Sequence, residues 1–238
     1  MKIAVLGDIH GNLEALKAAY DAAILSGAEK VYHLGDLGGY APFLNEVVDF
    51  LIEHDIEGVQ GNYDEAVANG DEHCGVRSED PLLRWMASLD FRWAKTHATP
   101  KTRNYLKALP SDISFYCEGH TVKICHATPV SNKLDWHEER DYYFSQDMAR
   151  LASADIIIYG HTHLPYRKDI DGKVLINAGS VGKPKDKDAR ACVAVVEISR
   201  DVVNSEFLRP VYEVEKTALA IVECGLPAYF ADKLREGR

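Results

Sequence analysis

The chain has 238 residues, of which 46% are hydrophobic and 27% are charged, and its formal net charge is −10. This balance is typical of a globular protein with a sizeable core. The acidic total argues against nucleic acid or an anionic membrane as the main partner, because binding to phosphate backbones needs clustered Lys and Arg.

The first third of the chain alternates short β-branched runs with helical patterns. Strands are predicted at 2–7, 30–35 and 56–61, and helices at 13–27 and 42–54. A strand, helix, strand order implies right-handed crossovers and a largely parallel start to a sheet.

Between about residues 65 and 110 the strand signal disappears. Amphipathic helices are predicted at 81–96 and 101–109, forming a helical cap over one rim of the sheet. Strand patterns then return at 113–117, 121–125, 155–160, 173–179, 191–199 and 203–211. Short amphipathic helices occupy about 213–238. The prediction is a single α/β domain over 1–238, built as a two-sheet sandwich.

Cysteine usage and the N-terminus bear on the compartment. The five cysteines are scattered and include no C-x-x-C pair, which argues against both a disulfide framework and a thiolate zinc site. The chain starts directly as a strand, without signal-peptide features or a long apolar run. We therefore expect a cytoplasmic protein.

Polar residues of metal-ligand type follow five of the apolar runs. These residues are Asp8 and His10, then Asp36, then Asn62 and Asp64, then His126, and finally His161 and His163. Because ligands of α/β folds bind outside the carboxyl ends of the strands, we expect these side chains to meet in one crevice.

Spacing adds to this expectation. In an extended chain residues i and i+2 point to the same side, so D-x-H and H-x-H pairs can each face one point. The glycines that precede the polar residues, which are Gly7, Gly35, Gly61 and Gly160, would let the backbone turn sharply.

The tetrapeptide HATP occurs twice, starting at His97 and at His126. His97 lies between helical stretches, with Thr99 and Pro100 placed as an N-cap and first helical residue. His126 follows an apolar strand, as the other polar clusters do. We therefore expect chemistry at His126 and a cap or loop role for His97.

A lone Asp or His after a strand is usually a turn or cap residue. Five such clusters are harder to explain in that way, since burying these groups without a partner costs several kcal/mol per charge. Metal ions are the natural partner. A set of imidazoles, carboxylates and one amide without thiolate suits Mn, Fe or Zn. Manganese is the metal we expect first, with iron, zinc or nickel as alternatives.

The segments GDIHGN, GDLGGY, GNYD, CHATP and GHTH together resemble the five blocks of the calcineurin-like metallophosphoesterase superfamily, in the same order. The small bacterial and archaeal branch of YfcE-type phosphodiesterases is the most similar, over nearly the whole chain. The resemblance implies an αββα two-sheet sandwich and a metal-dependent phosphoesterase.

The resemblance also implies two divalent metal ions. One would be held by Asp8, His10, Asp36 and His163, and the other by Asp36, Asn62, His126 and His161. Asp36, Asn62 and His126 would then take part in catalysis. A hydroxide bridging the metals would attack phosphorus, and both ions would neutralise charge on the phosphoryl oxygens.

The chain departs from the family pattern at Tyr63, where most members carry a histidine after Gly-Asn. A phenol is a poorer general acid than an imidazole at neutral pH. Turnover should therefore favour good leaving groups, as in nucleotide pyrophosphates or aryl phosphodiesters, and Asp64 would cap the following helix. No arginine follows the GDLGGY block, which disfavours protein phosphatase activity.

Three residues beside the ligand blocks are candidates for substrate contacts: Asn12, Tyr40 and Tyr63. The alternative for Asn12 is a helix start, and for Tyr40 packing against its loop. The predicted activity is hydrolysis of phosphodiester or nucleotide pyrophosphate bonds in a small phosphorylated substrate. A phosphomonoesterase and a non-catalytic metal-binding scaffold are the alternatives, and the sequence indicates no oligomeric state.

Overall fold

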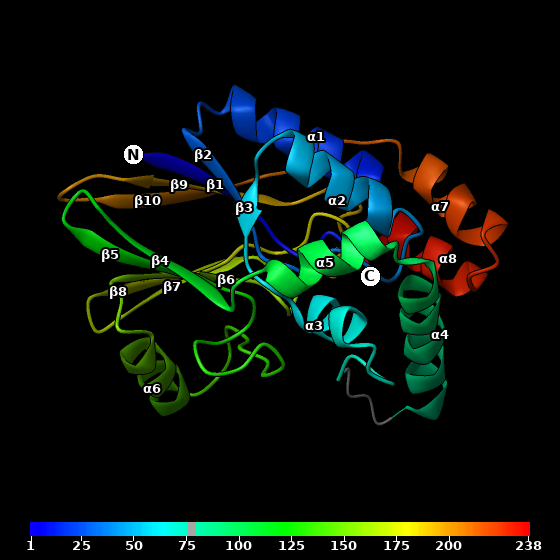
Figure 1. The fold of residues 1–238 in the computed structure, drawn as a ribbon. Helices are drawn as coiled ribbons and strands as arrows, with labels where there is room; N and C mark the ends of the chain where they lie inside the picture. Colours follow the sequence, from blue (N-terminus) through cyan, green and yellow to red (C-terminus); the bar gives the residue numbers. More distant parts are fainter. Residues whose placement is uncertain (76–79) are drawn as a thin grey trace.

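The computed structural model describes residues 1–75 and 80–238. Two five-stranded sheets pack face to face, with helices on their outer sides (Figure 1). The first sheet contains β1 (Lys2–Leu6), β2 (Lys30–His33), β3 (Glu57–Gly58), β9 (Val193–Ile198) and β10 (Val203–Leu208). The second contains β4 (Asp112–Cys117), β5 (His120–Cys125), β6 (Ile156–Tyr159), β7 (Tyr166–Ile170) and β8 (Lys173–Asn177).

The helices cover the outer faces and one end of this sandwich. They are α1 (Leu13–Leu25), α2 (Leu44–Glu53), α3 (Asn62–Asn69), α4 (Pro81–His97), α5 (Pro100–Ala108), α6 (Tyr142–Ala152), α7 (Val214–Glu223) and α8 (Ala228–Glu236). Helices α1 and α2 lie over the first sheet, α6 lies under the second, and α4, α7 and α8 gather at one end (Figure 1). No described helix is long and apolar enough to cross a membrane.

Strand order places several carboxyl ends at one edge. The first sheet has the order β10-β9-β1-β2-β3, and β1, β2 and β3 run parallel. The second has the order β4-β5-β6-β8-β7, in which β5, β6 and β8 run parallel. The antiparallel partners β4 and β7 form the two edges of the second sheet. The loops that leave the parallel strands are the ones that carry the polar clusters.

Residue alternation along β1 explains the layering. Ile3 and Val5 pack in the core between the sheets, while Ala4 and Leu6 belong to the core beneath the helices. Successive side chains of a strand point to opposite faces, so both faces of β1 must be apolar to be buried. The opposite face of the second sheet is covered by α6 and by Trp136, whose ring stacks on Tyr159 at 4.6 Å.

The predicted two-sheet α/β architecture is confirmed, as are its parallel start and the helices near both ends of the chain. Two elements were not predicted, namely α6 and β7. Strand β7 has the sequence YRKDI, of which only Tyr166 and Ile170 are buried. An edge strand with a polar centre has a weak apolar pattern, so the sequence does not predict it. Pairing with β8 stabilises this strand in the folded protein.

Candidate metal centre

The seven predicted ligands converge from five separate segments. They leave β1 and β2, begin α3, and follow β5 and β6. Two groups result, and within each group the ligand atoms lie within 4.8 Å of one another: Asp8, His10 and His163, and Asp36, His126 and His161. The Asn62 Oδ1 atom joins the second group, 3.0 Å from His126 Nε2.

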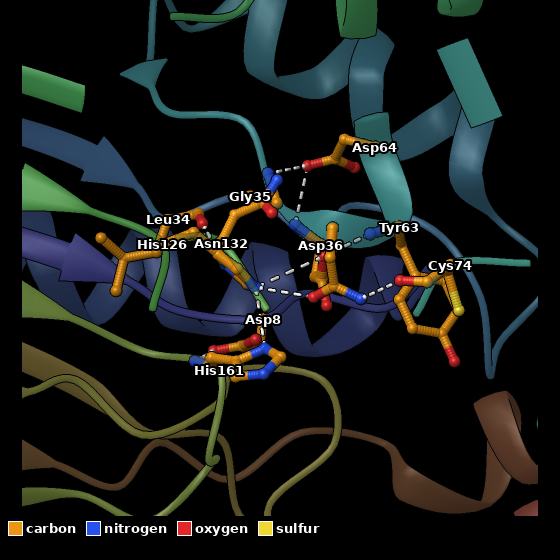
Figure 2. Close-up of polar contacts among 12 residues, drawn as sticks. Asp8, Leu34, Gly35, Asp36, Tyr63, Asp64, Cys74, His126, Asn132 and His161 are labelled. Carbon is orange, nitrogen blue, oxygen red and sulfur yellow. Dashed lines mark hydrogen bonds and ion pairs between the residues drawn. The ribbon is translucent and has the colours of Figure 1, made fainter. Parts of the chain in front are cut away.

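The Asp36 carboxylate lies between these groups. Its Oδ2 atom is 3.9 Å from His10 Nε2, and its Oδ1 atom is 3.6 Å from His126 Nε2. The same Oδ1 accepts the Tyr63 backbone N–H at 2.9 Å, which holds the carboxylate in place (Figure 2). A ligand shared by two cations would occupy this position.

Backbone carbonyls determine which nitrogen of each imidazole faces the cluster. The Nδ1 atoms donate from His10 to Gly38 at 3.0 Å, from His126 to Leu34 at 2.7 Å and from His163 to Lys183 at 2.6 Å. A carbonyl oxygen only accepts, so each Nδ1 carries the proton and each Nε2 presents a lone pair. The Nε2 atoms of His10 and His163 therefore face each other at 3.3 Å with no proton between them, an arrangement that a cation would stabilise.

Asp8 supplies a second sign of a missing positive charge. Its Oδ2 accepts the His161 N–H at 2.9 Å, but its Oδ1 is buried without a hydrogen-bond partner among the described residues. Burial, reinforced by repulsion from Asp36, raises the pKa of Asp8 well above its usual value. Buried polar atoms normally have partners, so the orphaned oxygen fits a metal ligand.

His10, His126 and His163 are neutral, which is the form that binds metal. Burial lowers the pKa of His10 to about 3 and that of His126 to about 4, and it lowers the pKa of His163 well below its usual value. Burial acts to raise the pKa of Asp36, but its interactions with the facing histidines, led by His126, and with the Tyr63 backbone N–H outweigh burial, so the pKa lies below its usual value. Neutral imidazoles and carboxylate oxygens form a donor set suited to divalent cations.

The backbone of the ligands corrects one prediction. Asp8, His10, Asp36, His161 and His163 all have positive φ, between 46° and 68°. The prediction that an extended chain aims the D-x-H and H-x-H pairs at one point is therefore wrong. Left-handed residues in tight loops orient these side chains instead. Each such residue costs of order 1–3 kcal/mol and persists because the surrounding structure holds it in place.

The glycines before the ligands also act differently from the prediction. Gly35 has a positive φ of 84°, as a sharp turn requires, but Gly7, Gly61 and Gly160 do not. A Cβ atom at Gly61 would collide with the Asp36 carboxylate, and one at Gly160 would collide with that of Asp8. These glycines leave room for the ligands to approach the backbone.

Asp64 holds the backbone around Asp36 in place, as Figure 2 shows. Its carboxylate accepts the backbone N–H groups of Asp36, Leu37 and Gly61 at 2.8 to 2.9 Å. The bond from Gly61 caps α3, which confirms the helix-capping role. Burial, with repulsion from Asp36, raises the pKa of Asp64 to about 7.

Two of the three candidates for substrate contact, Asn12 and Tyr40, lie outside the ligand groups. Asn12 is fully buried and caps α1 by accepting the Ala15 N–H at 3.2 Å, so it fills the helix-start role given as its alternative. Tyr40 is also buried, and it lines a neighbouring cavity.

Tyr63 borders the centre and connects it to the helical rim. Its ring meets His10 edge to face at 5.2 Å between centroids, and its Oη lies 3.4 Å from Asp90 Oδ1 on α4. Burial raises the pKa of Tyr63 well above its usual value, and the Asp90 carboxylate adds to this shift. The phenol therefore stays protonated and keeps its O–H as a hydrogen-bond donor.

A cleft of about 500 Å³ opens over the ligands, and it contains residues that the sequence reasoning did not select. Its lysines and one further carboxylate are Lys133, Asp135, Lys183 and Lys185. Asp135 Oδ1 lies 3.3 Å from His161 Nε2, the nitrogen that faces away from the metal groups. The lysines give the cleft a positive wall although the whole chain is acidic. The G-K-P-K segment at residues 182–185, in the loop after β8, was the available signal for two of them.

The other HATP histidine lies outside the centre. His97 ends α4, its Nδ1 donates to the Trp93 carbonyl at 2.8 Å, and its ring stacks on that indole at 4.1 Å. Thr99 caps α5 and Pro100 is its first residue. The structure thus places His97 at a helix end and His126 in a ligand group, and chemistry at His126 stays a prediction.

Several known proteins are similar to this chain in sequence and in fold. The model of the calcineurin-like phosphoesterase superfamily domain matches residues 1–201. The uncharacterized protein MJ0912 of Methanocaldococcus jannaschii is 30% identical over 99% of this chain and 98% of its own. A metallophosphoesterase from Sphaerobacter thermophilus is 25% identical, with a TM-score of 0.78 over all of both chains.

A second solved structure has the same fold. The hypothetical protein PH1004 of Pyrococcus horikoshii superposes with a TM-score of 0.83 at 20% identity, over 100% of this chain and 98% of that one. The family match and the full-length relative lead to one conclusion: this chain belongs to the calcineurin-like phosphoesterase superfamily and is an enzyme of its metallophosphoesterase class.

Proposed function

We propose that this protein is a metal-dependent phosphoesterase that hydrolyses phosphodiester or nucleotide pyrophosphate bonds. The observation that carries the proposal is the pair of buried ligand groups on either side of Asp36, in which unprotonated imidazole nitrogens and an orphaned Asp8 oxygen face one another. A lysine-lined cleft opens directly over these groups. Cation-binding groups beneath an anion-binding wall fit a phosphorylated substrate.

Two divalent ions fit the donor set, and manganese is our first choice. Asp8, His10, Asp36 and His163 would hold one ion, and Asp36, Asn62, His126 and His161 would hold the other. The bound ions would supply an activated nucleophile at neutral pH and neutralise charge on the phosphoryl group. The amide nitrogen of Asn62 donates to the Cys74 carbonyl at 2.9 Å, which leaves the amide oxygen free to act as a ligand.

The side chains around the cleft would bind and orient the phosphate. Lys183 and Lys185 are placed to attract phosphoryl oxygens, and Lys133 is held at the mouth of the cleft by Glu65 at 2.7 Å. Tyr63 would hydrogen-bond to the ester as a neutral phenol. Its raised pKa makes it a weak proton donor to the departing group, so substrates with good leaving groups should react best.

A solved structure described as a putative diadenosine tetraphosphatase shares the fold, with a TM-score of 0.53 at 15% identity over 87% of this chain and 93% of that one. Its description agrees with a nucleotide pyrophosphate substrate for this chain. No disulfide joins any of the five cysteines among the described residues, which suits the reducing cytoplasm.

Hydrolysis of bis(4-nitrophenyl) phosphate with added Mn²⁺ tests the proposal. We expect Asp36→Asn to lower kcat/KM by at least about 10³-fold and to reduce the bound metal measured by elemental analysis. Faster hydrolysis of 4-nitrophenyl phosphate than of the diester would favour the phosphomonoesterase instead. Two bound metals without a rate above that of Asp36→Asn would favour the scaffold.

A further inference from the structure

A second cavity of about 510 Å³ adjoins the metal cleft, and we call it the α4–α8 pocket. Helix α4 contributes Met86 and Ala87 to its wall, and α8 contributes Tyr229 and Phe230. In Figure 1 these two helices lie next to each other at the end of the sandwich. Ala87, Lys183 and Lys185 line both cavities. The pocket and the cleft are therefore contiguous, with two lysines at their junction.

The two lysines at the junction make no close ion pair with another described residue, although the Asp90 carboxylate, which also lines the pocket, attracts Lys183. Across residues 1–75 and 80–238, neither Lys183 nor Lys185 forms an ion pair with a carboxylate. At the outer rim of the pocket, Lys233 and Arg238 differ, since both pair with Glu236, at 3.7 and 2.8 Å. An anionic group of a ligand would therefore be attracted most to the place where the pocket meets the metal cleft.

Tyr40 supplies an independent sign of a ligand in the pocket. Its side chain is 2% exposed, and its hydroxyl has no hydrogen-bond partner among the described residues. Its backbone is left-handed, with φ of 68°, which is rare for a bulky residue. Lys183 Nζ lies 4.4 Å from the centre of the Tyr40 ring, and Phe230 packs edge-on against it at 5.1 Å. The ring is thus held firmly at the pocket wall with a buried donor unused.

We propose that the α4–α8 pocket binds a nucleoside group of the substrate, while Lys183 and Lys185 hold the phosphate that joins this group to the metal cleft. The proposal rests on the proposed function, because it uses the metal cleft as the site of hydrolysis. Flat aromatic walls favour a heteroaromatic base over an aliphatic group, since every base has a π-face that can stack. The Tyr40 hydroxyl is available to a polar atom of the base or sugar.

Two esters with the same leaving group separate the pocket from the chemistry. Thymidine 5′-(4-nitrophenyl phosphate) carries a nucleoside, and methyl 4-nitrophenyl phosphate does not. We expect KM to be at least about ten-fold lower for the thymidine ester, and Tyr229→Ala to reduce this ratio by about ten-fold. Tyr143→Ala is the matched control, since Tyr143 is 75% exposed on α6. Equal KM values for both esters, or a ratio that Tyr229→Ala leaves unchanged, would overturn the proposal.

Calorimetric titration of the metal-loaded full chain tests binding without turnover. Tyr229→Ala should weaken the binding of both thymidine and thymidine 5′-monophosphate by about ten-fold, because both ligands present the base. Lys185→Ala should weaken the binding of thymidine 5′-monophosphate but not that of thymidine. Lys185 is exposed, so its substitution should not disturb folding. If this pattern appears without hydrolysis of either ester, the pocket stands and the proposed function fails. If both esters are hydrolysed but neither variant changes binding, the pocket proposal fails alone.

Discussion

The metal cleft and the α4–α8 pocket share three lining residues, yet they are built differently. The cleft consists of loops at the ends of parallel strands, where buried ligands are fixed by backbone hydrogen bonds and left-handed residues. The pocket lies between two helices far apart in the sequence, and its lysine and tyrosine side chains are held mainly by packing. Under the proposed function, reaction chemistry would reside in the strand ends and substrate selection in the helical rim.

The two HATP histidines give the largest expected effect. His126→Ala removes a buried ligand of the cleft and should lower kcat/KM by at least about 10³-fold, the size of a lost transition-state charge interaction. His97→Ala, on the helical rim, should change kcat/KM by no more than about two-fold, because its ring stacks on Trp93 and its Nδ1 donates to the Trp93 carbonyl, away from the ligand groups. Steady-state kinetics with bis(4-nitrophenyl) phosphate measure both. Comparable losses in the two variants would remove the distinction between strand ends and rim.

Asp135 tests whether a loop residue positions a ligand of the centre. Asp135→Asn removes the charge that faces His161 Nε2 and should weaken metal binding by about 10- to 100-fold, as is usual for carboxylates behind a ligating histidine. Competition with a chelator measures this affinity separately from turnover. Asp169→Asn is the matched control, because Asp169 is an exposed carboxylate on β7 that pairs with Arg167. An unchanged affinity for Asp135→Asn would assign that residue to the surface.

Tyr63 joins the two regions, since it contacts His10 on one side and Asp90 of α4 on the other. Tyr63→His should raise kcat for phenyl esters by at least about ten-fold relative to 4-nitrophenyl esters, because an imidazole can protonate a poor leaving group. The slope of log kcat against leaving-group pKa measures the change. Tyr63→Phe should leave that slope as in the wild type. An identical slope in all three proteins would exclude a proton-donor role for this position.

His33 gives the smallest expected effect, and it concerns stability. It is fully buried on β2, and burial lowers its pKa to about 3. Because the folded pKa is below the unfolded one, its contribution is complete above about pH 6.5 and is lost as the pH falls toward 3. Between about pH 7 and 5.5 the wild type should lose about 1 kcal/mol more unfolding free energy than His33→Asn. Urea denaturation of both proteins measures the difference, and parallel pH curves would contradict it.

Much of the metal centre could be predicted from the sequence, because its signals are local. Five of the seven ligands directly follow an apolar strand pattern or a glycine, and His10 and His163 come two residues after one of them. Residue type alone identifies imidazole and carboxylate donors. Helices α1, α2, α7 and α8 were predictable for the same reason, since their apolar spacing is contained in one segment. Helix α6 and strand β7 were not, because their burial depends on the sheet that they cover or extend.

What only the tertiary structure decided is how distant segments meet. The left-handed backbone of Asp8 and His163, the lysines over the cleft, and the unpartnered hydroxyl of Tyr40 follow from contacts between loops and helices far apart in the chain. The sequence by itself determined which atoms can bind metal, since donor chemistry belongs to each side chain. Their mutual placement, and the pocket beside them, required the packed fold, because distance and burial are properties of the whole chain.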